Sequence, residues 1–450
     1  MNVPLDSIRG CLEGGVPSLL ASCARDGVPN LTYVSQVHYV DREHVALSFQ
    51  FFNKTYENVR ANPQAMAYVA DVDTGASYRL RLRYLRTEES GPLFESMKAK
   101  LAGIASHTGM SGVFLLRGAD VYHVHEVERV PGPEGTPRRP RCNPMSAVRR
   151  ITERIAAHSD LGTLLDDTLA ALEDQLGIRF AKVLLLETGR TRAPRLYTVA
   201  TRGYSTSGVG SEIAVGEGVI GMAAACRTPI RISHFTAEYT YGRAVREQVK
   251  ARGLADQLET EIPLPGLPAP ASQLAVPIIL GGQLAGVLYV ESPEDMRFSY
   301  DDEDALVAVA TQLGMAIAVL QQAADTQNDD APPAKEPAHQ APGAAAIVRL
   351  YRANDSVFID DDYLIKGVAG SIFAKLVRDY TADGRTEFSN RELRLDPAIR
   401  LPDVGDNLEA RLILLQRRLV ERCDFLRIAK TGRGRFHFDV KRPVKLVEVN

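Results

Sequence analysis

The stretch LILLQRRLVERCDFLRIAKTGRGRFHF, residues 412–438, has the pattern of a long basic helix followed by a β-hairpin. The leucines from Leu408 to Leu419 recur at spacings of four, three and four residues, which places them on one inward face of a helix. Two alternating segments follow, joined by a turn with glycines at positions 432 and 434. Because glycine permits tight turns, the sequence predicts a helix and a hairpin near this end of the chain.

Arginines form a second stripe on the same helix. Arg411, Arg418 and Arg422 repeat at spacings of seven and four residues, and residues 404–450 hold eleven Lys and Arg against six Asp and Glu. Such a face can reach phosphates and guanine edges, although a solvated basic helix has the same composition. The residues that we expect to contact DNA are Arg411, Arg417, Arg418, Arg422, Lys430, Arg433 and Arg435.

The elements upstream of this helix give the pattern a context. Three short strand-like runs between residues 347 and 366 precede a helical pattern over residues 368–380. Ser389 followed by Glu392 is a capping box that starts a short helix. This order resembles the winged helix-turn-helix effector domain of response-regulator transcription factors, but without their receiver domain. The resemblance covers residues 344–450 and implies DNA as a partner; a domain for protein contacts alone is the alternative.

Length and composition indicate a multidomain protein. The 450 residues leave room for about three domains. Residues 131–144 and 324–343 are rich in proline and polar residues, so we expect a linker and a disordered linker that separate domains at 1–130, 145–323 and 344–450. No apolar run of eighteen residues and no signal-peptide pattern is found, which predicts a cytoplasmic location and no membrane contact. The five scattered cysteines have no metal-ligand spacing.

Helical patterns bound the middle segment, over residues 145–176 and 301–320. Between them, GEGVIG at residues 216–221 precedes a helix of small residues, and AVPIILGGQLAGVLYVES at residues 275–292 is a hairpin. These motifs resemble a GAF domain, an α/β sandwich, over nearly the whole segment. The resemblance implies a small-molecule or redox sensor, and the motifs do not specify its ligand.

Three further inferences concern this middle segment. An Asn-Lys-Xaa-Phe-Asp-Glu motif is missing, which disfavours a cyclic nucleotide as the ligand. Cys226 lies in the helix of small residues, where it is either a redox or attachment thiol or a small core residue. The terminal helices are apolar enough to pair between subunits, so we expect a homodimer that presents two DNA-binding modules to a two-fold site.

The first segment has six strand patterns interrupted by helical patterns over residues 53–62 and 93–105, which predicts a barrel. HVALSFQFFNKTYENVRANPQAMAYV, residues 44–69, resembles the FMN-binding split barrels of the pyridoxamine-5′-phosphate-oxidase superfamily. The resemblance implies FMN, with its phosphate on a Lys and a Thr at a helix N-terminus, which supply charge and donors. The implied cofactor residues are Ser48, Gln50, Phe51, Lys54 and Thr55, of which the last two hold the phosphate.

The barrel residues also allow other interpretations. Lys54 can instead pair with Glu57 or Glu88 while Thr55 caps its helix, and neither residue then holds a phosphate.

A barrel of this class can also hold haem or a deazaflavin. His123 and His125 share one face of a strand, and His107 lies in a loop, so each is either an axial haem ligand or a surface residue. No set of metal ligands and no pair of nucleophile and base is recognisable, so we predict no metal site and no catalytic residue.

Together the patterns predict a multidomain α+β chain: a split β-barrel, a GAF sandwich and a winged helix-turn-helix. The predicted function is a cytoplasmic, signal-responsive transcriptional regulator that senses a flavin, redox or small-molecule signal and binds DNA. The alternative is an FMN-dependent oxidoreductase whose GAF and winged-helix parts are regulatory. A third possibility is a barrel that has lost its cofactor and serves dimerisation.

Overall fold

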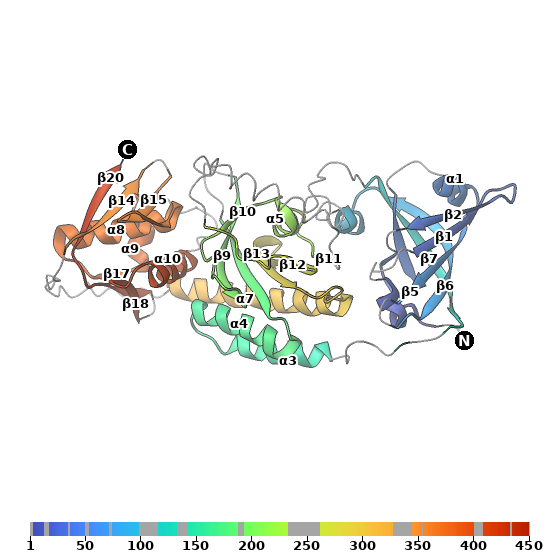
Figure 1. The fold of residues 1–450 in the computed structure, drawn as a ribbon, viewed down its shortest axis with the longest axis horizontal. Coiled ribbons are helices and arrows are strands. Elements are labelled where there is room, and N and C mark those ends of the chain that lie inside the picture. Colours follow the sequence, from blue (N-terminus) through green and yellow to red (C-terminus); the bar gives the residue numbers. More distant parts are fainter. Residues whose placement is uncertain are drawn as a thin grey trace.

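The computed structural model places three units in a row, with the N-terminus in the first unit and the C-terminus in the third (Figure 1). The first two units are each built on one antiparallel sheet, and the third on two smaller sheets. The structure describes residues 3–449 except 13–17, 35–36, 50–53, 72–73, 99–115, 133–134, 136–142, 188–192, 233–261, 327–343, 353, 400–407 and 433.

A curled seven-stranded sheet forms the N-terminal unit, in the order β2-β1-β5-β6-β7-β4-β3. Burial alternates along β1, as expected for a strand with one face on a core, and that core includes Leu20, Leu80 and Tyr122. The single strand expected at residues 31–40 was wrong: β2 and β3 lie at opposite edges of the sheet. The elements are η1 (Leu5–Leu12), β1 (Ser18–Cys23), β2 (Pro29–Val34), β3 (His38–Tyr39), β4 (His44–Phe49), α1 (Lys54–Ala61), β5 (Gln64–Ala70), β6 (Ser77–Glu88), β7 (Gly118–Val130) and a helix over residues 92–98.

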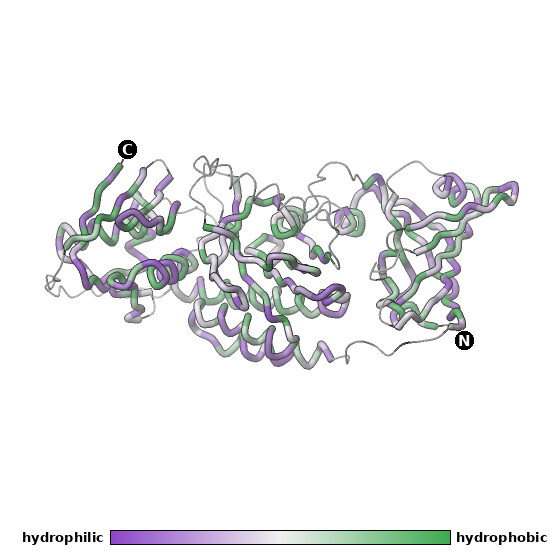
Figure 2. Tube along the Cα trace, viewed as in Figure 1, coloured by the Kyte–Doolittle hydropathy of each residue, from purple (hydrophilic) through white to green (hydrophobic). Residues whose placement is uncertain are grey.

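The middle unit has a six-stranded antiparallel sheet in the order β10-β9-β8-β13-β12-β11. Apolar residues of α3, α4 and α7 share a core with one face of this sheet, and α5 covers the other face. Figure 2 shows hydrophilic and hydrophobic residues alternating along α3 and α4, which matches helices with one buried side. The elements are α3 (Pro144–Ala156), α4 (Leu161–Leu176), β8 (Phe180–Glu187), β9 (Arg195–Arg202), β10 (Glu212–Ala214), α5 (Gly218–Cys226), β11 (Ile230–Ile232), β12 (Ser272–Leu280), β13 (Gln283–Ser292) and α7 (Tyr300–Thr326).

The helix that the sequence predicted over residues 145–176 is interrupted. It ends at Ala156, and a second helix starts after Asp160, whose side chain accepts a hydrogen bond from the Thr163 backbone N at 3.0 Å. Aspartate at this position satisfies backbone donors that have no partner inside the helix, so it starts a new helix. Asp160 was not recognised as a cap because the apolar spacing continues across the break.

Helix α7 runs along the middle unit from the N-terminal unit towards the C-terminal unit (Figure 1). Its residues 300–322 are long and apolar enough to cross a membrane, and no other described helix is. Leu306, Val309 and Leu313 of this helix are completely buried in the core of the middle unit, however. The helix therefore serves as a core helix here.

The junction between the first two units lies at the start of α7. Arg9 forms an ion pair with Asp304 at 2.9 Å, and its guanidinium lies 5.2 Å from the centre of the Tyr300 ring. The Tyr300 hydroxyl donates to the Leu12 carbonyl at 3.4 Å. The first turn of α7 therefore contacts the N-terminal unit as well as its own middle unit.

The C-terminal unit follows the order that the sequence predicted, with a small sheet, a helix, a short capped helix, a basic helix and a hairpin. The Ser389 side chain accepts a hydrogen bond from the Glu392 backbone N at 3.4 Å, whereas the Glu392 carboxylate pairs with Arg385. Only the serine half of the capping box is therefore formed. The elements are β14 (Ala346–Tyr351), β15 (Ser356–Ile359), β16 (Asp362–Ile365), α8 (Gly367–Asp383), β17 (Glu387–Ser389), α9 (Asn390–Leu395), α10 (Leu408–Arg422), β18 (Leu426–Gly432), β19 (Arg435–Val440) and β20 (Val444–Val449).

A glycine in the middle sheet provides a test of this packing. A Cβ atom at Gly286 in β13 would lie 2.1 Å from the Leu184 carbonyl oxygen of β8, so the Gly286→Ala variant must move one strand. We expect it to lose about 1–3 kcal/mol of unfolding free energy in urea denaturation followed by circular dichroism. Gly132→Ala is the matched control, because a Cβ there meets no atom within 4 Å. Equal midpoints for both variants would contradict the strand register.

Candidate functional site

Helix α10 lies between the middle and C-terminal units. It contacts α8 and β16 of its own unit and α4 and β9 of the middle unit. One continuous apolar core therefore includes residues of both units. The residues of α10 that are buried are Leu408, Glu409, Ala410, Arg411, Leu412, Ile413, Leu414, Leu415, Arg418 and Leu419.

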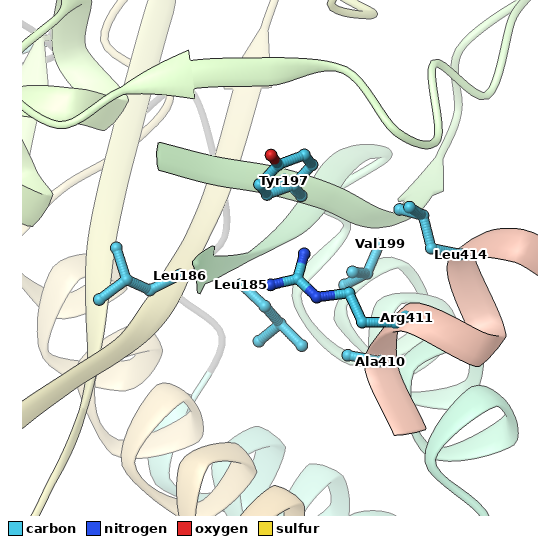
Figure 3. Close-up of a pocket in the computed structure, with 7 residues that line it drawn as sticks. All are labelled: Leu185, Leu186, Tyr197, Val199, Ala410, Arg411 and Leu414. Atoms are coloured by element: carbon cyan, nitrogen blue, oxygen red, sulfur yellow. The ribbon is translucent and has the colours of Figure 1, made fainter. Parts of the chain in front are cut away.

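Arg411 is a nearly enclosed cation that faces the middle unit. Its Nη2 lies 2.8 Å from Oε1 of Glu187 at the end of β8, and the two side chains are only 8% and 11% exposed. The guanidinium also lies over the ring of Tyr197, 5.1 Å from its centre. Around these groups is a small hollow, shown in Figure 3, lined by Leu185, Leu186, Tyr197, Val199, Ala410, Arg411 and Leu414.

Arg417 and Lys430 make the outer contacts of the same interface. Arg417 donates to the Val199 carbonyl at 2.7 Å and pairs with Asp166 of α4 at 2.8 Å. Lys430 of the hairpin pairs with Asp160, the residue that caps α4. The cap and the interface therefore depend on the same carboxylate.

Arg418 has a structural role within the C-terminal unit. Its Nε donates to the Leu364 carbonyl of β16 at 3.0 Å, and its Nη1 pairs with Glu421 at 3.0 Å. The side chain is 3% exposed, and burial lowers the pKa of this guanidinium below its usual value. Arg418 therefore holds α10 to β16.

The residues predicted to contact DNA lie in different surroundings in the structure. Arg411, Arg417 and Arg418 do not lie on the open face that the sequence predicted, because protein carboxylates and carbonyls contact them in this conformation. Arg422, in contrast, is exposed at the end of α10. Arg435 is half-buried in β19, and Arg433 lies outside the described residues.

A cation that sequence reasoning missed completes the interface. Lys366, just before α8, lies 3.3 Å from Glu212 of β10, and both side chains are less than 10% exposed. Glu212 also accepts from Arg195 at 2.9 Å. Lys366 follows a strand and lies far from the basic helix in sequence, so no charge pattern singled it out.

The middle unit also contains a buried polar cluster on the sheet face that carries α5. Lys182 of β8 is 1% exposed and lies 4.7 Å from the centre of the Tyr289 ring and 3.9 Å from Glu291. Its ammonium donates to the Pro265 carbonyl, and Glu291 accepts from the Leu267 backbone N at 3.1 Å. Burial lowers the pKa of Lys182 to about 8, although Glu291 opposes the shift.

The family comparison bears on this middle unit. Residues 160–317 match the GAF domain family. They form a GAF domain. The sequence-based prediction of this domain is thereby confirmed, and a signal-sensing role is supported. No curated protein matches the chain.

Solved structures resemble parts of the chain. The GAF domain of an Acinetobacter phosphoenolpyruvate-protein phosphotransferase is 22% identical, with 42% of this chain and 100% of that chain covered and a TM-score of 0.31. Free methionine-R-sulfoxide reductase from Neisseria meningitidis, in complex with its substrate, is 20% identical over 40% and 91% of the two chains, with a TM-score of 0.30. An FMN-binding protein from Syntrophomonas wolfei is 15% identical over 28% and 86%, with a TM-score of 0.25.

Cys226 of the GAF domain is the thiol that the sequence suggested for redox sensing. It ends α5 and is partly buried, and burial raises the pKa of its thiol above the usual value. Because the thiolate is the reactive form, this environment favours a packing role over a redox role.

Three of the residues predicted to hold FMN lie in the described part of the N-terminal unit. Lys54 is exposed at the first position of α1, but Thr55 is buried and its Oγ1 accepts from Asn30 at 2.8 Å. Glu88 pairs with Arg86 instead of Lys54. Ser48 is exposed in β4, while Gln50 and Phe51 lie outside the described residues. Lys54 and Thr55 are therefore adjacent at the start of α1, with the lysine exposed to solvent and the threonine packed against β2.

Three histidines gather on the outside of β4 and β7. The ring of His123 lies 5.5 Å from that of His44 and 4.6 Å from that of His125, and Asp41 Oδ1 lies 2.8 Å from His44 Nδ1. Within the described part of the chain no group of three or more His, Cys, Asp or Glu can hold a metal ion. His107, the third candidate for haem, lies outside that part.

The buried lysine predicts a distinctive pH dependence. The unfolded chain holds the Lys182 proton up to a pKa of 10.5, whereas the folded chain releases it near 8. The unfolding free energy should therefore rise between these pH values, by at most about 3 kcal/mol. We expect urea unfolding curves to show this rise in the wild type and not in Lys182→Met. Parallel pH profiles for the two proteins would contradict the assignment.

Proposed function

We propose that this chain is a cytoplasmic, signal-responsive transcriptional regulator. The GAF domain senses a small-molecule or redox signal, and the C-terminal unit is a winged helix-turn-helix that binds DNA as part of a homodimer. The order of elements from β14 to β19 supports the second assignment, since it has the helices and the hairpin that such domains use. Exposed Arg422 at the end of α10 is then a DNA contact.

One observation carries this proposal: α10 belongs to the cores of the GAF domain and the C-terminal unit at once. A ligand that binds one arrangement of the GAF domain better than another changes the surroundings of α10. The ligand can shift the equilibrium between the two arrangements by no more than the difference in its binding free energy for them. Sensor and output therefore need no separate connecting element.

A second candidate function is a C-terminal unit that makes protein contacts only. The burial of Arg411 and Arg418 against protein groups favours it.

Binding of the purified full chain to its own upstream DNA, against scrambled competitor across a salt series, tests the proposal. We expect specific binding that weakens with salt, and Arg422→Ala should flatten the plot of log K against log salt by about one unit. Arg149→Ala is the control, because this exposed arginine of α3 pairs with Glu153. Lack of DNA preference would favour the protein-contact function, and an unchanged slope would remove Arg422 from the DNA contacts.

A further inference from the structure

We infer that an acidic rim of the GAF domain competes with DNA for the cations of the C-terminal unit. The rim consists of Asp160, Asp166, Glu187 and Glu212. This inference rests on the proposed DNA binding and names its regulation. In this inference, carboxylates of the GAF domain occupy the cations that the phosphates of nucleic acid would otherwise bind.

The ion pairs that the structure describes between the two units all have the same polarity. Among the described residues, four pairs cross this interface, and in each the carboxylate belongs to the GAF domain and the cation to the C-terminal unit. The pairs are Glu187 with Arg411 at 2.8 Å, Glu212 with Lys366 at 3.3 Å, Asp166 with Arg417 at 2.8 Å, and Asp160 with Lys430.

The acidic rim contacts the two elements that the proposed DNA binding would use. Three of its four partners, Arg411, Arg417 and Lys430, are residues that the sequence assigned to DNA, and they lie on α10 and on the hairpin. A winged helix uses these two elements on a duplex. A guanidinium that is enclosed by Glu187 and Tyr197 cannot also reach a phosphate or a base, so the two bound states exclude each other.

The inner and outer pairs differ in what they contribute. Arg411 with Glu187 and Lys366 with Glu212 are nearly excluded from water, so removal of either carboxylate takes a negative charge away from a buried cation. Such a cation favours any state that returns it to water or to a phosphate. The outer acids, Asp160 and Asp166, are 35% and 63% exposed, and pairs of this kind contribute little and are screened by salt.

The decisive variant is the full chain with Glu187→Gln and Glu212→Gln together. We expect about tenfold or more tighter binding to the upstream DNA, with faster hydrogen exchange in residues 408–422. Glu173→Gln is the matched control, because this glutamate pairs at 2.6 Å with Arg202 inside the GAF domain. The control should match the wild type in both measurements.

A second variant keeps the test valid if the Glu187→Gln, Glu212→Gln variant fails to fold. Asp160→Asn with Asp166→Asn removes the outer acids, and it should shift DNA binding and hydrogen exchange in the same direction by a smaller factor. Faster exchange in α10 without tighter DNA binding would overturn the competition, and unchanged exchange in both variants would show that the rim does not hold α10. If α10 is released and no chain binds any DNA, the proposed function itself fails.

Discussion

The burial of α10 from two sides is the constraint on which the rest of the structure depends. A helix with leucines on one side and arginines on another normally exposes its charged side to water. Here Arg411 and Arg417 meet GAF carboxylates, and the apolar residues of the helix pack against both units, so little of the helix remains free. The GAF domain and the C-terminal unit therefore each cover apolar and charged side chains of the other.

The sequence predicted the elements of the C-terminal unit and the GAF domain well, because both depend on local patterns. Leucine spacing located α10, and the Ser389 cap located α9. It did not predict where the Arg411 side chain points, since a cation on a helix surface has the same spacing whether its partner is a phosphate or Glu187. The partner lies more than 200 residues away, beyond the reach of periodicity.

The FMN residues illustrate a second limit of sequence reasoning. A Lys and a Thr at the start of α1 match a phosphate site by residue type, and their backbone position agrees with that expectation. The Thr55 hydroxyl also accepts a hydrogen bond from Asn30, a residue of a neighbouring strand that no motif connects to it. The direction of a side chain at a helix start depends on residues that are distant in sequence, and a short sequence motif does not include those residues.

The shared core also bears on how the protein unfolds and how it can be divided. Ile413 and Leu414 are buried where the two units meet, and a C-terminal unit released alone would expose them with Ala410 to water. Exposed apolar patches of this kind promote association. The GAF domain and the C-terminal unit should therefore melt as one cooperative block, and a protease that cuts the chain between them should leave the two fragments associated.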